Sequence, residues 1–311
     1  MLDGQTTLVP VVDESACGSA AIVTTEAATN LVKHAGGGEI LLRGLEDGVE
    51  VIALDRGPGM ADVGASLRDG HSTVGTQGNG LGAIRRMATT FDIYSARGQG
   101  TAVLARMRSR PVSRTTSRLE IGAVSLPKSG ETVSGDSWLA GPTARGTRIL
   151  VVDGLGHGPI AHDAAQAAVD AFRAAPNESV EAAVETCHLA LRSTRGAALA
   201  VTEVDVEAGV VRFAGVGNIA GSIWNDNRSH HTVSHNGTAG QGTVRIREFS
   251  YPWVKGALLV LASDGLATRW TLESYPGLPA RDPSLVAAIL YRDHSRQRDD
   301  VTVVVAREPR A

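Results

Sequence analysis

Residues 148–158 read RILVVDGLGHG, where an apolar run ends at Asp153 and a glycine-rich loop follows. The run is short and rich in β-branched residues, which is typical of a buried strand. Asp153 therefore stands at the end of that strand, and the glycines after it let the backbone come close to a metal or a phosphate group. We interpret this stretch as one side of a ligand site built on a sheet.

Three further aspartates occupy comparable positions in the second half of the chain. Asp136 lies in SGDSW, Asp264 follows ALLVLAS and opens DGL, and Asp299 opens DDVTVVVA. Carboxylates that converge at strand ends repel one another unless cations lie between them, and hard oxygen ligands suit Mg²⁺ or Mn²⁺. One such aspartate is commonly a turn residue, but four in the order GD…DGxGHG…SDG…DDxT predict a metal site.

The order of these motifs resembles that of the metal-dependent (PPM) serine/threonine phosphatases, in their bacterial SpoIIE/RsbX branch, over residues 119–307. The resemblance implies an αββα sandwich with two Mn²⁺ or Mg²⁺ ions between its sheets. It also implies that a metal-activated water attacks phosphoserine directly. The ligands that it implies are Asp136, Asp153, the carbonyl of Gly154, Asp264 and Asp299, with Asp299 preferred to the adjacent Asp300.

Glycine-rich loops also mark the first half of the chain. The apolar run VIALD leads into DRGPGM, where Gly57 and Gly59 allow close approach of the backbone to a ligand. In GTQGNGLGAIRRM, residues 75–87, three alternating glycines stand just before a predicted helix: Gly78, Gly80 and Gly82. Such a backbone at a helix N-terminus can hold phosphate, and the spacing excludes the P-loop and the dinucleotide-binding motif.

Glu26 and Asn30 are four residues apart in a predicted helix over 15–35, so they share one face. A solvated helix face explains this pair when it is taken alone. Followed by the glycine loops and by Gly100-Thr101, the pair resembles the GHKL (Bergerat) ATP-binding fold and, within it, the RsbT-like and RsbW-like serine kinases of bacterial partner switching. The stretch NLVKHAGGGEI is more similar to RsbT than to the anti-sigma factors.

This second resemblance implies an ATP site with Mg²⁺. Asn30 would hold the Mg²⁺, and Glu26 would be the base for an acceptor serine. Asp55 would accept a hydrogen bond from the adenine amino group. The other residues implied at the site are Gly57, Gly59 and Thr101 near the base, and Gly78, Gly80 and Gly82 along the triphosphate. A neutralised triphosphate, backbone donors and a carboxylate near the acceptor hydroxyl suffice for phosphoryl transfer.

Hydrophobic patterning predicts an α+β fold, and the two resemblances imply an N-terminal GHKL α/β sandwich followed by a PPM-type αββα sandwich. In the first half we expect helices over 15–35 and 81–89 and strands over 39–45, 49–54, 91–96 and 101–107. In the second half we expect helices over 161–174 and 179–193 and strands over 119–126, 147–152, 197–206, 209–215, 257–262 and 301–306. The polar stretch RSRPVSRTTSR is the best linker candidate, which places the domains at 1–112 and 113–311.

Composition narrows the class of protein further. A net charge of −3 argues against a nucleic-acid partner. The two cysteines, Cys17 and Cys187, lie too far apart for a disulfide scaffold. Apolar runs are too short to span a bilayer and no signal peptide is evident, so we expect a cytoplasmic protein without a membrane partner. Glycine supplies 36 of 311 residues, well above its average share of about 7 %.

Two hypotheses for the function follow. In the first, the chain is a bifunctional partner-switching regulator that phosphorylates and dephosphorylates a serine or threonine of a STAS-domain antagonist or stressosome protein, and so controls a sigma-factor or stress response. In the alternative, the chain is a phosphatase whose GHKL half only senses ATP or docks a partner. The alternative is motivated by the 25 residues before Glu26, which offer at most a short strand over 7–12. A homodimer is compatible with either hypothesis.

Overall fold

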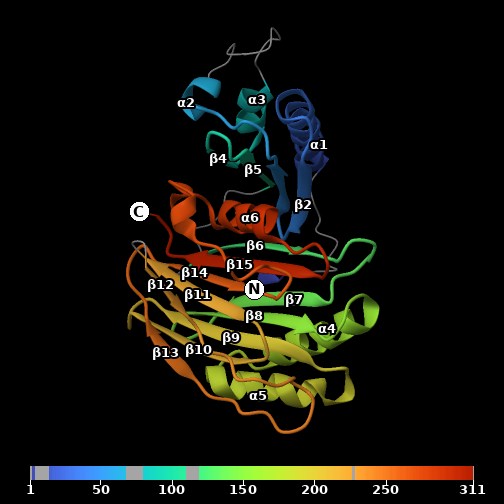
Figure 1. Cartoon of the computed structure of the whole chain (residues 1–311), viewed down its shortest axis with the longest axis vertical. Helices are drawn as coiled ribbons and strands as arrows, with labels where there is room; N and C mark the ends of the chain where they lie inside the picture. Colours follow the sequence, from blue (N-terminus) through green and yellow to red (C-terminus); the bar gives the residue numbers. More distant parts are fainter. Residues whose placement is uncertain (1, 4–13, 68–79, 110–118, 226–227, 311) are drawn as a thin grey trace. The chain divides into compact units, whose positions relative to one another are not determined.

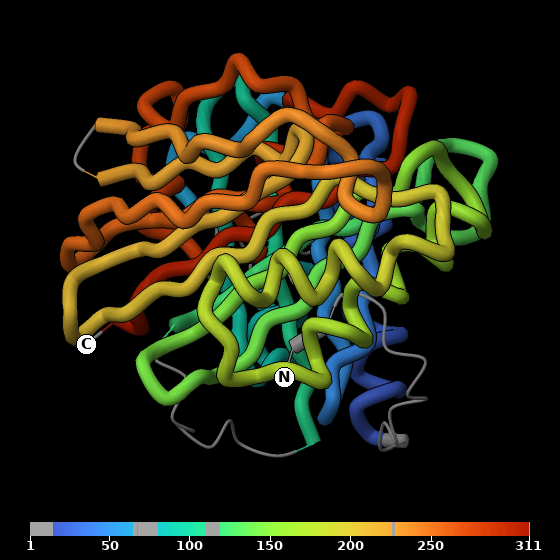
Figure 2. The backbone as a smooth tube through the Cα atoms, turned by 90° about the horizontal axis from the view of Figure 1, so that it is seen from below, coloured from blue at the N-terminus to red at the C-terminus, as the bar shows by residue number. Residues whose placement is uncertain are grey.

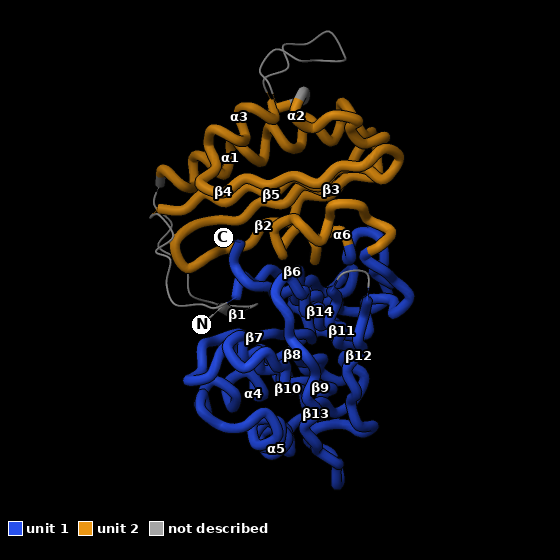
Figure 3. The backbone as a smooth tube through the Cα atoms, turned by 90° about the vertical axis from the view of Figure 1, so that its left-hand side faces the viewer, with its two compact units in different colours: residues 1–6, 116–272, 290–311 blue, residues 7–115, 273–289 orange. Residues whose placement is uncertain are grey.

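The computed structural model describes residues 2–3, 14–67, 80–109, 119–225 and 228–310. The chain forms two compact units, which Figure 3 distinguishes by colour. Unit 1 comprises Met1–Thr6, Thr116–Leu272 and Leu290–Ala311. Unit 2 comprises Thr7–Thr115 together with a second segment, Glu273–Ile289, from much later in the sequence. The predicted boundary after residue 112 lies outside the described residues and stays a prediction.

Unit 1 contains two antiparallel sheets (Figure 1, Figure 2). The first has six strands in the order β1 (Leu2–Asp3), β7 (Asp136–Pro142), β8 (Thr147–Gly154), β9 (Ala197–Asp205), β10 (Val210–Val216) and β13 (Phe249–Pro252). The second has five in the order β12 (Arg228–His231), β11 (Ala220–Asn225), β14 (Leu258–Ala262), β15 (Val301–Arg307) and β6 (Glu120–Leu126).

The central strand β8 shows why these sheets stack. Its side chains alternate between faces, as in any strand. Ile149 and Val151 join the core between the two sheets, whereas Leu150 and Val152 face the helices α4 (Pro159–Ala174) and α5 (Val180–Ala190). Because both faces of β8 are covered, the strand reads as a continuous apolar run. The result is a sandwich of two sheets flanked by helices.

Unit 2 contains one four-stranded antiparallel sheet in the order β2 (Glu39–Leu45), β3 (Gly48–Leu54), β5 (Thr101–Arg108) and β4 (Thr90–Ser95). Helices α1 (Glu14–Asn30) and α3 (Gly80–Met87) cover one face, where Val23, Ala27 and Ile84 pack on Val51 and Ala105. Helix α1 continues as a π-helical turn, Leu31–Ala35, and ends at the left-handed Gly36. A one-turn helix α2 (Val63–Ser66) follows β3.

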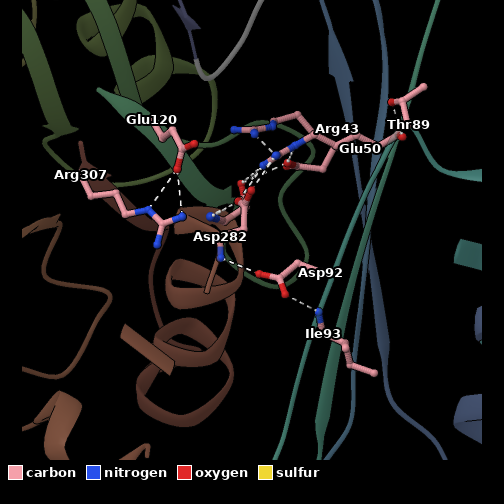
Figure 4. A network of polar contacts seen from close by, with 10 residues as sticks. Arg43, Glu50, Thr89, Asp92, Ile93, Glu120, Asp282 and Arg307 are labelled. Carbon is pink, nitrogen blue, oxygen red and sulfur yellow. Dashed lines mark hydrogen bonds and ion pairs between the residues drawn. The ribbon is translucent and has the colours of Figure 1, made fainter. Parts of the chain in front are cut away.

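The opposite face of this sheet carries a buried ion-pair network (Figure 4). Glu50 and Arg106 share that face, and the Arg106 guanidinium donates to Glu50 at 2.7 Å and to both carboxylate oxygens of Asp282 at 2.7 and 2.8 Å. Ser284 Oγ donates to Glu50 at 3.1 Å. Burial by itself lowers the pKa of Arg106, but the carboxylates of Glu50 and Asp282 outweigh it and hold that pKa above its ordinary value. The network ties segment Glu273–Ile289 to the sheet of unit 2.

That segment begins within the 3-10 turn Leu272–Ser274 and contains a second 3-10 turn, Leu278–Ala280, and the first half of α6 (Pro283–His294). Helix α6 belongs to unit 2 up to Ile289 and to unit 1 from Leu290. Sequence patterning did not predict it. Every residue from Leu285 to Leu290 is fully buried, so the helix lacks the one-sided apolar stripe by which a helix is recognised.

The α+β class is confirmed, as are the predicted strands over 39–45, 91–96, 147–152 and 197–206, within a residue or two at their ends. The predicted helices over 161–174 and 179–193 correspond to α4 and to α5 with its following 3-10 turn. The predicted strand over 7–12 and most of the linker over 108–118 lie outside the described residues. Among the helices that are described, none is both long and apolar enough to cross a membrane.

Candidate functional site

The ends of β7 and β8 bring two of the predicted ligands together in unit 1. Asp136 and Asp153 are direct cross-strand partners in the antiparallel pair, and side chains in that relation have Cβ atoms about 4.5–5.5 Å apart. Asp136 is 1 % exposed. Two carboxylates therefore stand side by side at one end of the first sheet.

Ser263 links this end of the first sheet to the second sheet. Its Oγ donates to Asp136 Oδ2 at 2.6 Å and accepts a hydrogen bond from the backbone N of Thr302 at 2.9 Å. Asp264 follows Ser263 directly, and its Oδ2 accepts a hydrogen bond from Asn218 Nδ2 at 2.8 Å. The loop after β14 thereby joins the carboxylate pair of β7 and β8.

The neighbours Asp299 and Asp300 have different surroundings. Asp300 is buried, and its two oxygens accept hydrogen bonds from the backbone N of Lys128 at 2.8 Å and of Gly135 at 2.9 Å. Asp299 is exposed and accepts only from the backbone N of Asp300 among the hydrogen bonds that the described residues show. Asp300 is thus committed to holding the turn before Asp136, which favours Asp299 as the ligand of the pair.

The electrostatics of the cluster follow from this crowding. Burial raises the pKa of Asp153 to about 9, with further contributions from Asp136, Asp264, Asp299 and Asp300. Burial likewise raises the pKa of Asp136 to about 7, although the hydrogen bond from Ser263 opposes the shift. The pKa of Asp264 is also raised, first by burial and then by Asp299. Four neighbouring carboxylates therefore lie close enough to Asp153 to disfavour its ionised form, and Asp299 acts on Asp264 in the same way.

This donor set suits a hard divalent cation, because it offers only oxygen and its mutual repulsion is relieved by positive charge. No group of three or more His, Cys, Asp or Glu side chains in the described part of the chain is already arranged to hold an ion. The carboxylates would therefore have to draw together around a metal. The oxygen donors of the site suit the predicted Mn²⁺ or Mg²⁺, and their side chains stand further apart than they would around a bound ion.

Gly154 shows why the DGLGHG loop needs glycine. A Cβ atom on Gly154 would lie 2.2 Å from the carbonyl oxygen of Ala161, in the first turn of α4. The Gly154 backbone N donates to the Gly135 carbonyl at 3.0 Å, which joins the loop to the turn before Asp136. His157 lies further along the loop and pairs through Nδ1 with Glu131 at 2.6 Å. This pair holds the loop against Glu131 and leaves His157 outside the set of predicted ligands.

Neither Ser263 nor Asn218 was singled out from the sequence. Ser263 stands inside the SDG motif, directly before a predicted ligand, and that adjacency is the signal that could have found it. Asn218 had no comparable signal, because it lies 46 residues before the aspartate that it contacts.

In unit 2, Gly80 lies against the predicted pair on α1. A Cβ atom on Gly80 would lie 2.9 Å from Asn30 Oδ1 and 3.2 Å from Glu26 Oε2. Asn30 Nδ2 is buried and has no hydrogen-bond partner among the residues described. An unpaired amide and a carboxylate beside a helix N-terminus that lacks a side chain form a cradle that fits a Mg²⁺-bound polyphosphate.

The other predicted ATP residues gather around Asp55. Asp55 Oδ1 accepts hydrogen bonds from the backbone N of Gly57 at 2.8 Å and of Thr101 at 3.1 Å. Gly59 has a φ of 67°, and a Cβ there would lie 2.0 Å from the carbonyl oxygen of Ala96. The turn therefore leaves no room for a side chain at position 59. Gly82 is buried within α3, and Gly78 lies outside the described residues.

Unit 1 has the architecture of the PP2C-like phosphatases, and unit 2 is a sheet domain of the histidine kinase-like ATPase type. Residues 143–309 match the family described as Stage II sporulation protein E (SpoIIE). The chain belongs to this family. Residues 10–107 match the histidine kinase-like ATPase domain.

Two relatives from Bacillus subtilis (strain 168) match one half of the chain each. The N-terminal half is 36 % identical over 85 residues to serine/threonine-protein kinase RsbT, a match over 26 % of this chain and 64 % of RsbT. This chain thus spans less than two thirds of the length of RsbT. Phosphoserine phosphatase RsbX is 25 % identical over 142 residues, which are 45 % of this chain and 71 % of RsbX. The chain therefore combines an RsbT-like domain with an RsbX-like domain.

Solved structures agree with this assignment. A solved structure from a study of the bacterial stressosome as a modular system is similar to this chain, with a TM-score of 0.56 and 29 % identity. The match covers 61 % of this chain and 99 % of the other chain. Crystalline RsbX in complex with magnesium matches 61 % of this chain and 96 % of its own, with a TM-score of 0.53 and 21 % identity. The second likeness shows the fold alone.

Proposed function

We propose that unit 1 is a Mn²⁺- or Mg²⁺-dependent phosphatase that acts on phosphoserine or phosphothreonine in a protein. The convergence of Asp136, Asp153, Asp264 and Asp299 at one end of the sandwich carries the proposal. These carboxylates, with the Gly154 carbonyl, would hold two ions. Bound ions would acidify a water and neutralise the phosphate. The likeness to RsbX supports the same chemistry.

The residues around the carboxylates would keep them in place during the reaction. Ser263 orients Asp136, Asn218 orients Asp264, and Asp300 holds the backbone at Gly135. A water oxygen bonds to phosphorus as the bond from phosphorus to the serine oxygen breaks. The serine oxygen takes up a proton, and inorganic phosphate leaves.

Hydrolysis of a phosphoserine peptide by the purified full chain tests this proposal. We expect hydrolysis with Mn²⁺ or Mg²⁺, loss of activity in excess chelator, and recovery when the metal is restored. Asp264→Ala should abolish the activity. Glu207→Gln, a carboxylate in a turn away from the cluster, is the matched control and should keep it. Full activity in excess chelator would contradict the proposal.

We further propose that unit 2 binds ATP with Mg²⁺ and transfers the γ-phosphate to a serine or threonine of a STAS-domain antagonist or stressosome protein. The cradle formed by Glu26, Asn30 and Gly80 supports this assignment. Asn30 would hold the Mg²⁺, and Glu26 would accept the proton of the attacking hydroxyl as the new bond to phosphorus forms and ADP leaves. The two units would then set the phosphorylation state of one partner.

Labelled ATP with candidate STAS-domain proteins tests the kinase. We expect serine or threonine phosphate with the wild type and a reduction of about a hundredfold or more with Glu26→Gln, the range for loss of a general base. Glu39→Gln removes an exposed carboxylate of β2 and should leave the transfer unchanged. ATP binding without transfer to any candidate would favour the nucleotide-sensing module instead.

A further inference from the structure

A short loop of unit 1, residues 294–298 (the HSRQR loop), runs beside the chain that follows Asp264. The backbone N of Ala267 donates to the His294 carbonyl at 2.9 Å, and the backbone N of Arg296 donates to the Gly265 carbonyl at 2.8 Å. Leu266 and Ser295 form an antiparallel bridge between the same two segments. Arg296 is therefore held directly opposite the neighbour of a proposed metal ligand.

The backbone of this loop is unusually constrained. Gln297 has a φ of 55°, and it is the only non-glycine residue in the left-handed region within the described ranges. Its backbone N donates to Ser295 Oγ at 3.2 Å. A residue with a Cβ atom in this region costs free energy that the surrounding structure must supply, and such residues gather at functional sites. The turn at Gln297 separates Arg296 from Asp299, so the loop brings an arginine to the edge of the carboxylate cluster.

The positive charge of Arg296 acts on the cluster and is not neutralised by an ion pair among the residues that the structure describes. Its guanidinium opposes the rise in the pKa of Asp264. The side chain is exposed, and no carboxylate in the part of the chain that the structure describes lies within ion-pair distance of it. Some other arginines of unit 1 are paired with carboxylates, such as Arg307 with Glu120. Arg296 is thus a solvent-facing cation beside an acidic site.

We propose that Arg296 binds the phosphoryl oxygens of the substrate as the phosphate enters the carboxylate cluster. The inference rests on the proposed phosphatase activity of unit 1. A phosphate monoester carries about two negative charges near neutral pH and is repelled by carboxylates. A guanidinium offers two parallel N–H donors that match the oxygens of a phosphate, which a compact ammonium cannot do. Arg296 therefore supplies both the opposite charge and the geometry for this anion.

Steady-state kinetics of the full chain with saturating Mn²⁺ and p-nitrophenyl phosphate test the inference. In Arg296→Ala, KM for this substrate and the inhibition constant of inorganic phosphate should both rise about tenfold or more, the loss expected for a charged hydrogen bond. For Arg296→Lys, both constants should lie between those of the wild type and those of Arg296→Ala. Arg298→Ala removes the same charge from the same loop and should change both constants less than about twofold.

A purely electrostatic role toward Asp264 would give another result. In that case Arg296→Ala would change only the concentration of Mn²⁺ needed for activity, and KM and the inhibition constant at saturating metal would match the wild type, which overturns the inference. If the wild type hydrolyses nothing, the proposed phosphatase activity fails separately. Calorimetric titration of inorganic phosphate into the Mn²⁺-loaded protein then decides: weaker binding by Arg296→Ala supports the role of Arg296, and equal binding overturns it.

Discussion

The two candidate sites of this chain are built on opposite principles. The site of unit 1 gathers like charges, since Asp136, Asp153 and Asp264 are partly or fully buried, and Asp136 and Asp264 both raise the pKa of Asp153. The site of unit 2 gathers free space, because Gly80 leaves room beside Asn30 that one methyl group would fill. The first arrangement asks for a cation and the second for a polyanion. The kind of ligand that a site binds can therefore be inferred from the way in which its residues lower the stability of the ligand-free fold.

The free energy by which the ligand-free fold is destabilised differs between the two sites. Buried carboxylates destabilise the folded state at any pH where they are ionised, unless an opposite charge joins them. Glycines at a helix N-terminus cost only backbone entropy. The predictions that follow test this contrast between an acidic site that is held under repulsion and a glycine cradle that is nearly free of strain.

The largest effect is expected for Asp153→Asn. Phosphoserine hydrolysis should fall by about a thousandfold, since the variant loses a ligand worth several kcal/mol of transition-state stabilisation. The melting temperature of the metal-free protein should stay the same or rise, because one repelling carboxylate is gone. Asp170→Asn, an exposed position on α4, should change neither quantity. A metal-free protein that melts much earlier in Asp153→Asn would refute the idea of repulsion.

A comparable loss, in stability rather than in activity, is expected for Arg106→Ala in unit 2. The variant leaves Glu50 and Asp282 buried without their cation, which costs about 3–5 kcal/mol for a broken buried pair. Arg173→Ala, which breaks the exposed pair with Asp170, should cost less than about 1 kcal/mol.

Urea unfolding can assign the Arg106 effect to its unit. All four tryptophans lie in unit 1: Trp138, Trp224, Trp253 and Trp270. Fluorescence therefore reports unit 1, whereas circular dichroism reports both units. An early transition in circular dichroism without one in fluorescence is expected. Coincident transitions at the wild-type midpoint would show that the network does not stabilise unit 2.

A smaller effect is expected for Gly80→Ala. The added methyl group displaces Asn30, so ATP affinity measured by calorimetry should fall by about tenfold, the value of one charge-assisted contact. Gly18→Ala is the matched control, because a Cβ there meets nothing within 4 Å and alanine favours a helix by about 0.5–1 kcal/mol. It should keep ATP affinity and raise stability. Unchanged ATP binding in Gly80→Ala would place the nucleotide elsewhere.

The smallest effect is a pH dependence of the acidic site. The folded-state pKa values of Asp136 and Asp153, about 7 and about 9, lie above the ordinary value of an aspartate. Their cost to the metal-free fold is therefore absent below about pH 4, grows as the pH rises, and is complete above about pH 9. A metal binds the ionised form, so the rise in melting temperature caused by Mg²⁺ should be larger at about pH 8 than at about pH 6. Asp153→Asn should weaken this dependence, and an Mg²⁺ effect independent of pH would contradict it.

Much of both sites was visible in the sequence. The run before Asp153 is apolar at every position from Ile149 to Val152, because a strand covered on both faces excludes polar side chains. Asp153 lies at the end of β8 and Asp264 lies just beyond β14, so the aspartates and glycines of DGLGHG and SDG marked the site of unit 1. The spacing of Glu26 and Asn30 and the glycines before α3 marked the site of unit 2 in the same way.

Contacts between distant residues could not be predicted in this way. Ser263 lies 127 residues from Asp136, and Arg106 lies 176 residues from Asp282. Local patterning records which face of an element is buried, but not which element buries it. The resemblance had already implied Asp299 rather than Asp300 as the ligand, and the two backbone amides that bind Asp300 supply a physical reason for that choice. Helix α6 was not predicted because its residues from Leu285 to Leu290 are all buried.

The sequence by itself determined the elements and the chemistry of this protein: strands that end in carboxylates, helices that begin after glycines, and two halves with distinct motifs. These depend on side-chain periodicity and on local backbone freedom, which neighbouring residues encode. Only the tertiary structure decided that Asp136 faces Asp153, that Asp300 holds a turn, and that residues 273–289 complete the unit formed by the first half of the chain. Those outcomes depend on strand register and on the pairing of buried charges, which arise only when distant segments pack together.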